Sequence, residues 1–101
     1  MDRFEKLPLH DATFDFINIK WEDYIVEIKL FAFVKNNENA LPYTLKFAEV
    51  SEMYFPHKNP WGESKYINNV YVKNGMYHIE IQSGDIIKTK SKDFSFEPIN
   101  L

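Results

Sequence analysis

The stretch from Ser64 to Phe96 constrains the fold of this chain more than any other part of the sequence. Apolar residues alternate with polar ones along it, and two turn signals interrupt the alternation, Asn74-Gly75 and Ser83-Gly84-Asp85. Alternation with a period of two residues is typical of a half-buried β-strand. Asn-Gly between two such runs is the strongest short-range signal of a β-hairpin. The stretch therefore predicts an antiparallel β-meander.

The Asn74-Gly75 turn fixes the pairing of the strands on either side of it. A two-residue loop there places Val70 opposite Ile79 and Tyr71 opposite His78. Because side chains alternate between the two faces of a strand, one face becomes apolar and turns to the interior. The residues expected on this interior face are Val70, Val72, Tyr77, Ile79 and Ile81.

The second turn is compatible with two registers. A two-residue Ser83-Gly84 loop suits the glycine, but it sets Ile79 against Lys88. A three-residue loop over Ser83–Asp85 instead aligns Ile81 with Ile87, so that apolar side chains share one face. We therefore predict the three-residue loop.

Two earlier apolar runs, Thr13–Trp21 and Tyr24–Val34, predict another hairpin, with Glu22-Asp23 as its polar loop. The opposed pairs in this register are Trp21 with Tyr24, Ile19 with Val26, Ile17 with Ile28 and Phe14 with Phe31. The far end of the hairpin is then apolar on both faces. This requires either a β-bulge between Phe16 and Ile17 or a partner that covers the second face.

The remaining segments complete an all-β pattern. Apolar alternation from Tyr43 to Phe47 predicts a strand, and Ala48–Phe55 fits either a helical turn or a short strand that ends at Pro56. We expect the short strand. Six to eight strands at roughly 8–12-residue spacing are typical of a sandwich or barrel. The sequence predicts a single, mostly antiparallel all-β domain over residues 1–101, rich in meanders and arranged as a sandwich or partly open barrel.

Composition limits the classes of function. The chain has 101 residues, a net charge of −3, a single arginine and no cysteine. Thiolate chemistry, disulfides and cysteine-bound zinc are therefore excluded, and nucleic-acid binding is not expected because the Lys88–Lys92 run resembles the solvated face of an edge strand. Since the sequence shows neither a signal-peptide core nor a spanning apolar run, we expect a soluble, cytoplasmic protein that does not enter membranes.

No constellation typical of catalysis is found. His10, His57 and His78 lack the spacing of metal ligands, and His78 is expected on an exposed strand face packed on Tyr71. Neither a serine-nucleophile motif nor a glycine-rich phosphate loop is present. We expect a non-enzymatic protein without metal or cofactor. A small hydrolase would need His10 and Asp11 to meet a distant carboxylate.

Two segments contain candidate binding residues. His10-Asp11 precedes the first strand, where it forms either a polar pair at a groove or a structural contact in which the aspartate bonds nearby amides. Trp61 lies in an irregular loop, where it is either a recognition residue or a plug over the core. The predicted binding residues are His10, Asp11, His57, Trp61 and Ser64.

Three short motifs resemble those of a group of small bacterial all-β proteins, some of which are thought to be immunity proteins of contact or polymorphic toxin systems. The motifs are Leu9-His10-Asp11-Ala12, Trp61-Gly62-x-Ser64 and Gln82-Ser83-Gly84-Asp85, and the resemblance spans about residues 9–92. It implies an all-β fold, no catalytic residues and a toxin as the partner.

The expected function is a non-enzymatic protein-binding module, an immunity-type inhibitor of a bacterial toxin. The alternative is a small-molecule or carbohydrate-binding β domain with Trp21, Trp61 and tyrosines lining its pocket. A homodimer is a further expectation if the faces that contain Phe14, Phe16, Phe31 and Phe33 need a covering partner.

Overall fold

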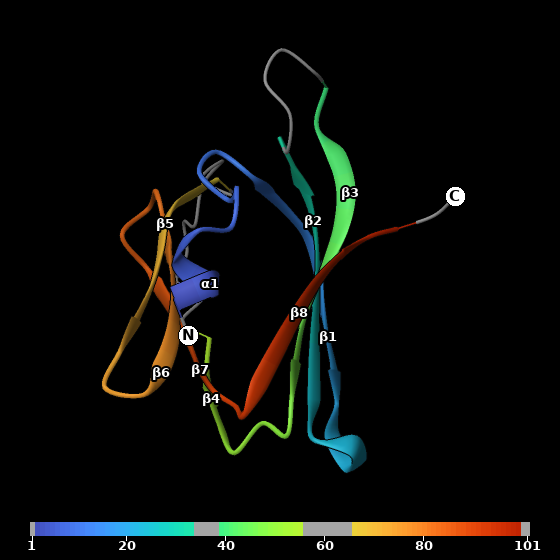
Figure 1. Ribbon diagram of the computed structural model, residues 1–101, viewed down its shortest axis with the longest axis vertical. Helices are drawn as coiled ribbons and strands as arrows, with labels where there is room; N and C mark the ends of the chain where they lie inside the picture. Colours follow the sequence, from blue (N-terminus) through green and yellow to red (C-terminus); the bar gives the residue numbers. More distant parts are fainter. Residues whose placement is uncertain (1, 34–38, 56–65, 100–101) are drawn as a thin grey trace.

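The computed structural model describes residues 2–33, 39–55 and 66–99, which form eight strands, one short helix and one 3-10 turn. The strands are β1 (Thr13–Lys20), β2 (Ile25–Ala32), β3 (Leu41–Ala48), β4 (Glu52–Tyr54), β5 (Ile67–Lys73), β6 (Met76–Ile81), β7 (Ile86–Lys90) and β8 (Asp93–Pro98). Sheet A has the order β1-β2-β3-β8 and sheet B the order β4-β7-β6-β5, and every pair is antiparallel. The two sheets face each other (Figure 1). The predicted all-β sandwich is confirmed.

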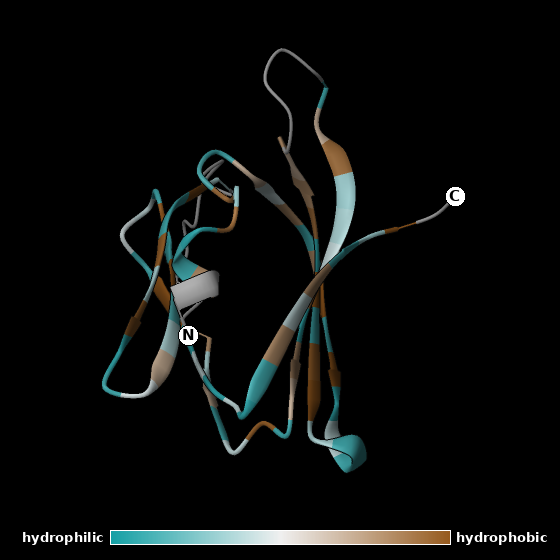
Figure 2. Cartoon of the chain, in the orientation of Figure 1, coloured by the Kyte–Doolittle hydropathy of each residue, from teal (hydrophilic) through white to brown (hydrophobic). Residues whose placement is uncertain are grey.

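The core lies between the two sheets and follows from alternation along the strands. In β2 every second residue is buried, from Val26 to Ala32, and hydrophobic and hydrophilic residues alternate along the ribbon (Figure 2). Burial of one such aliphatic side chain stabilises the fold by roughly 1.5–3 kcal/mol. The buried apolar residues of the strands are Val26, Ile28, Leu30, Ala32, Leu45, Phe47, Ile67, Val70, Tyr77, Ile79, Ile81 and Ile87.

The N-terminal segment is part of this core. The helix α1 (Asp2–Glu5) lies between the two sheets, beside β5 (Figure 1). Phe4 is fully buried, and its ring centroid lies 4.7 Å from that of Tyr77, 5.3 Å from that of Phe94 and 6.0 Å from that of Phe47. Phe47 and Phe94 belong to sheet A and Tyr77 to sheet B. The segment therefore fills space that strand side chains leave open, and it contacts both sheets.

A two-stranded ribbon passes from one sheet into the other. β3 continues into β4 and β7 continues into β8, while β3 pairs with β8 and β4 pairs with β7. Glu49, with φ of 51°, lies at the bend, and the N–H of Ser51 donates to the carbonyl of Lys90 over 2.8 Å. On the opposite side a single bridge joins Thr13 to Tyr66. Within the described residues the ladders do not close into a barrel.

Two predicted registers are confirmed. Val70 pairs with Ile79 across the Asn74-Gly75 turn, whose residues have φ of 53° and 75°. Ile17 pairs with Ile28 in the first hairpin. The short strand predicted after Ala48 is present as β4. Among the described residues, no helix has the length and apolar character that crossing a membrane requires.

The predicted second turn is wrong by one position. The loop has three residues, but they are Gln82–Gly84, and Ile79 rather than Ile81 faces Ile87. The N–H of Gly84 donates to the carbonyl of Ile81, and φ of Gly84 is 99°. A three-residue hairpin loop places its left-handed residue last, which is where glycine is favoured. The register moves by two residues, so the same side chains still face the interior.

The first hairpin also differs in detail from its prediction. The bulge lies between Phe14 and Phe16, not between Phe16 and Ile17. Phe14 consequently packs against the core, while Phe16 remains half-exposed beside the Lys29 ammonium. The strands end at the Lys20–Ile25 pair, and a 3-10 turn over Trp21–Asp23 replaces the two-residue loop. The bulge thus removes Phe14 from the second, outward face of the hairpin, which is therefore less apolar than the sequence predicts.

Candidate binding groove at the tip of the first hairpin

His10 and Asp11 lie where the lead-in to β1 meets the start of β5. Nδ1 of His10 lies 2.8 Å from the carbonyl oxygen of Asn68, and because a carbonyl only accepts, this nitrogen carries the proton and donates. The side-chain amide of Gln82 donates to Oδ1 of Asp11 over 3.2 Å. The structure therefore brings Asp11 and Gln82, which belong to two of the short sequence motifs, into contact.

Backbone hydrogen bonds reinforce this corner. The N–H of Asp11 donates to the carbonyl of Ile67, and the N–H of Ile67 donates to the carbonyl of Ala12, both over 2.8 Å. These bonds join the entry of β1 to the entry of β5. Such contacts fit a structural role for Asp11. Across the described residues, no group of three or more His, Asp and Glu side chains is placed to hold a metal ion.

The other predicted site residues do not join this corner. His57, Trp61 and Ser64 lie outside the described residues, so their roles stay predictions. His78 stacks on Tyr71 with ring centroids 4.9 Å apart, as expected, but it is buried rather than exposed. Its Nδ1 donates to the carbonyl of Met76 over 3.0 Å. This imidazole therefore forms part of the packing of sheet B.

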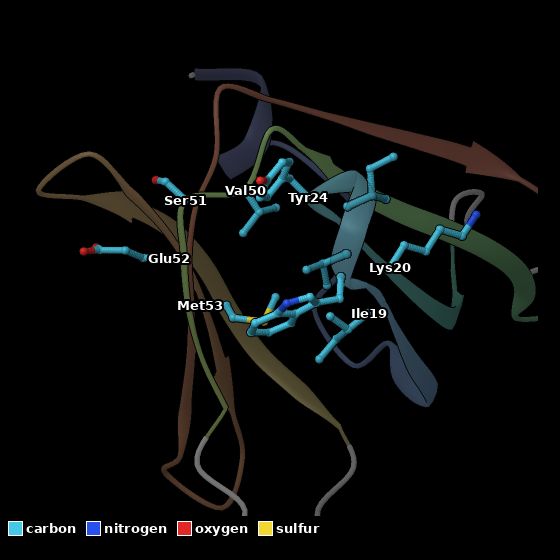
Figure 3. A pocket seen from close by; sticks show the side chains of 10 residues that line it. Ile19, Lys20, Tyr24, Val50, Ser51, Glu52 and Met53 are labelled. Carbon is cyan, nitrogen blue, oxygen red and sulfur yellow. The ribbon is translucent and has the colours of Figure 1, made fainter.

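An apolar groove of about 280 Å³ lies between the tip of the β1–β2 hairpin and β4. One wall is formed by residues 19–21 and 24–26 of the hairpin, and the other by residues 50–53 (Figure 3). Of these residues, the sequence predicts a pocket role by name only for Trp21, and for tyrosines such as Tyr24 only as a group. One sequence feature could have indicated the groove: the apolar residues on the interior face of the hairpin extend over more positions than the short strand opposite them can cover.

The interior-facing side chains of the hairpin are exposed at its tip and on the edge strand β1, whereas Val26, the partner of Ile19 on β2, is buried. Val26 is 1% exposed, Ile19 42%, Tyr24 67% and Trp21 80%. The hairpin strands have eight residues each, whereas β4 has three and follows the bend at Glu49. The tip therefore extends past the cover that sheet B provides. Its apolar side chains remain in water.

A backbone hydrogen bond fixes the closed end of the groove. The N–H of Val50 donates to the carbonyl of Tyr24 over 2.8 Å. Tyr24 itself has φ of 57° and ends the 3-10 turn. Tyr24 lies at the tip of the hairpin, and beyond Val50 the chain turns away from sheet A into β4. The groove is the space between the hairpin and the segment from Val50 to Met53.

Side-chain directions differ between the residues of the β4 wall. Met53 points from β4 toward the hairpin, where Ile19 lies, whereas Ser51 and Glu52 point to the side away from the hairpin (Figure 3). Both nevertheless line the groove. Met53 is therefore the β4 side chain that points into the groove.

The tip has more carboxylates than ammonium groups. Between residues 19 and 27 the sequence has Glu22, Asp23 and Glu27 but only one cation, Lys20. Nζ of Lys20 lies 2.9 Å from Oε1 of Glu27, and the hydrogen bond and charge of this carboxylate raise the pKa of Lys20 above its ordinary value. The 3-10 turn with Glu22 and Asp23 forms the hydrophilic end of the hairpin (Figure 2). Glu22 and Asp23, which lie between the groove residues Trp21 and Tyr24, thus form an acidic rim at this end of the groove.

Comparison with models of known families, with curated proteins and with solved structures finds no match to this chain.

Proposed function

We propose that this chain is a non-enzymatic protein-binding module that binds its partner through the hairpin-tip groove. The main observation behind this proposal is that Trp21 lies in one groove with Tyr24 and Met53. Trp21 is the most exposed large apolar side chain among the described residues. Tryptophan and tyrosine are enriched among the residues that dominate binding energy at interfaces. Exposed apolar patches with polar rims are typical of interaction sites.

The shape of the groove supports a macromolecular partner over a small molecule. Small-molecule pockets usually measure about 300–1,000 Å³ and enclose most of their ligand. The groove of about 280 Å³ falls below that range, and the high exposure of Trp21 and Tyr24 leaves it open along one side. A protein surface can cover such a groove, whereas a small ligand would keep much of its own surface in water.

We propose a bacterial toxin as the partner, blocked by occlusion of its active site. The small size of the chain, the acidic rim and the resemblance of its short motifs to immunity-type proteins support this proposal. A complex of standard size would bury about 1,200–2,000 Å². An acidic rim favours association with a basic surface, mainly by accelerating encounter.

The experiment is a pull-down in which the tagged protein is presented with the products of neighbouring genes. Trp21→Ala should weaken binding of the captured partner by at least about tenfold, since a central aromatic contributes about 2 kcal/mol or more to an interface. The change should barely alter the urea midpoint because Trp21 is 80% exposed.

Phe16→Ala is the matched control, since Phe16 is another exposed aromatic residue of the same hairpin but does not line the groove. It should bind the partner like the wild type. Capture of no partner from the organism's own cells, or equal losses in both variants, would contradict the proposal.

A further inference from the structure

We propose that two copies of this chain join along the free edge of β1, in antiparallel orientation, so that their four-stranded A sheets form one continuous sheet. A strand at the edge of a sheet presents unpaired N–H and C=O groups, which a strand of another chain can bind. The proposed function uses the groove at the hairpin tip rather than this edge. The inference therefore goes beyond that function and does not depend on it.

Hydrogen bonds of sheet A identify the free peptide groups of β1. The N–H of Ile99 donates to the carbonyl of Pro42, which therefore faces β8. Successive residues of a strand direct their N–H and C=O groups to opposite sides. Followed through the registers of β3 with β2 and of β2 with β1, this alternation directs Asn18 to β2 and turns Ile17 and Ile19 away from it. The N–H and C=O groups of these two isoleucines face the free edge.

The outer edge of β5 differs because side chains already bind its donors. Val70 and Val72 face away from β6. The N–H of Val70 donates to Oδ1 of Asn69 over 2.9 Å, and the N–H of Val72 donates to Oε1 of Glu5, in α1, over 3.2 Å. A strand that added to β5 would have to displace both of these acceptors.

The edges of β8 and β4 present only isolated donors. In β8 the N–H of Phe94 donates to Oδ1 of Asp93 over 2.8 Å, and Pro98 has no N–H, which leaves Phe96. In β4, which has three residues, only Met53 faces away from β7. Among the described strands, β1 is thus the one edge on which two successive outward N–H groups have no side-chain acceptor.

The exposure of β1 also fits a missing neighbour. No residue of β1 is buried, whereas every second residue of β2 is. Ile19 is 42% exposed although its partner Val26 is buried. A long edge strand with apolar side chains in water is a site of association between chains. Both the backbone and the side chains of β1 therefore favour pairing with another strand.

β1 is complementary to itself in one antiparallel register. With the two-fold axis at Asn18, Ile17 of each copy lies opposite Ile19 of the other. Residues paired in this way exchange both of their backbone hydrogen bonds, so the free groups of the two edges satisfy each other. The isoleucine side chains of both copies then lie next to one another on the interior-facing side, where they form apolar cross-strand pairs.

Charge complementarity favours a second copy as the occupant of the edge. Asp15 and Lys20 lie at opposite ends of it, so antiparallel pairing brings Lys20 of each copy beside Asp15 of the other. Within one chain Lys20 contacts Glu27 and Asp15 contacts Lys29, so these ion pairs would join into a network across the interface. At the axis the neutral Asn18 meets its own copy.

The first test is light scattering of the purified protein across a range of concentrations. The average mass should rise from that of a monomer toward that of a dimer. Hydrogen-exchange protection of the Ile17 and Ile19 amides should rise with it, because pairing satisfies these N–H groups. A monomer at every concentration, in which both amides exchange freely, would overturn the proposal.

Ile17→Pro and Ile17→Ala form a matched pair. Both remove the isoleucine side chain, but only proline removes the N–H that faces the free edge, and edge strands tolerate proline. Ile17→Pro should raise the dissociation constant of the dimer at least about tenfold over that of Ile17→Ala, since the bond is lost in both copies. Equal dissociation constants would overturn pairing through this edge. Amide protection in the wild type decides the outcome if the proline variant does not fold.

An exchange of charges tests the register. Lys20→Glu should weaken the dimer, because it places a carboxylate beside Asp15 of the second copy. Adding Asp15→Lys to the same chain should restore dimerisation. Positions 15 and 20 lie about 15 Å apart along one strand, so recovery reports a contact between copies. A double variant that dimerises no better than Lys20→Glu would overturn the antiparallel register.

The outcomes separate this inference from the proposed function. If the protein dimerises but no natural partner is captured, the dimer stands and the function fails. If a partner that requires Trp21 is captured by a protein that stays monomeric, the function stands and the dimer is wrong. If the Ile17 and Ile19 amides of such a monomer become protected only in the complex, the edge accepts a strand of the partner instead of a second copy.

Discussion

Asp11 combines an unusual backbone conformation with a side-chain contact. Its φ of 67° lies in the left-handed region, which aspartate and asparagine tolerate better than other non-glycine residues. Its carboxylate accepts a hydrogen bond from Gln82, and its N–H donates to Ile67. These three features together fix the corner between β1 and β5, which fits the structural alternative for this residue better than a hydrolytic one.

We expect Asp11→Ala to lower the free energy of unfolding by about 1–2 kcal/mol, because alanine is strained at this φ and cannot accept from Gln82. Asp11→Asn should cost less than half as much, since asparagine tolerates the left-handed region and retains an acceptor. Urea denaturation of both variants measures the difference. If the alanine variant has wild-type stability, Asp11 has no structural role at this corner.

Trp21 shows how far a pattern of residue types can locate a site. Alternation with Ile17 and Ile19 predicts the face on which it lies, and that face does turn toward the interior side of sheet A. Alternation does not reveal that sheet B ends before Trp21, because the length of the opposite strand depends on the bend at Glu49. The groove could therefore not be predicted from its own residues.

The two hairpins of sheet B illustrate different degrees of predictability. Asn74-Gly75 specifies both the length and the position of its loop, because only one arrangement places both residues at positive φ. For the next turn, apolar alternation fixes which face is buried but not the register, since a shift of two residues keeps every side chain on its face. The position of Gly84 decides that register, through its φ of 99°.

Gly84→Ala should therefore destabilise the protein by about 1–2 kcal/mol, as alanine is strained at that φ. A Cβ on Gly84 would meet no atom within 4 Å, so the loss would be purely conformational. Gly75→Asn is the control, because asparagine is accepted in such hairpin turns, and its loss should be smaller. Thermal unfolding monitors both. An unchanged melting temperature for Gly84→Ala would refute the Gln82–Gly84 loop.

The two sheets are held together by more than their facing strands. Phe4, from a segment whose sequence shows no periodicity, packs against Phe47 and Phe94 of sheet A and Tyr77 of sheet B. A four-residue helix cannot be stable alone, so tertiary packing rather than helix propensity holds Phe4 in place. Neither apolar alternation nor turn motifs in the sequence indicate that a residue such as Phe4 packs between the two sheets.

Phe4→Ala should reduce the free energy of unfolding by about 3–5 kcal/mol, the usual cost of truncating a fully buried phenylalanine. For a domain with a total stability of about 5–15 kcal/mol this is a large loss. Phe16→Ala, at a half-exposed position, should cost about 0.5 kcal/mol. Equal urea midpoints for the two variants would show that the N-terminal segment does not belong to the core.

The ribbon that bends between the sheets has a consequence for how the polypeptide acquires its shape. β8 completes the sheet to which β1–β3 belong, and β4 completes the sheet to which β5–β7 belong. The four strands of sheet B follow one another along the chain, whereas sheet A stays incomplete until residues up to Pro98 have been synthesised, because β3 pairs with β8 as well as with β2. Pairings so distant along the backbone make folding slow. They also make it all-or-none, so native hydrogen-exchange protection in both layers should disappear together.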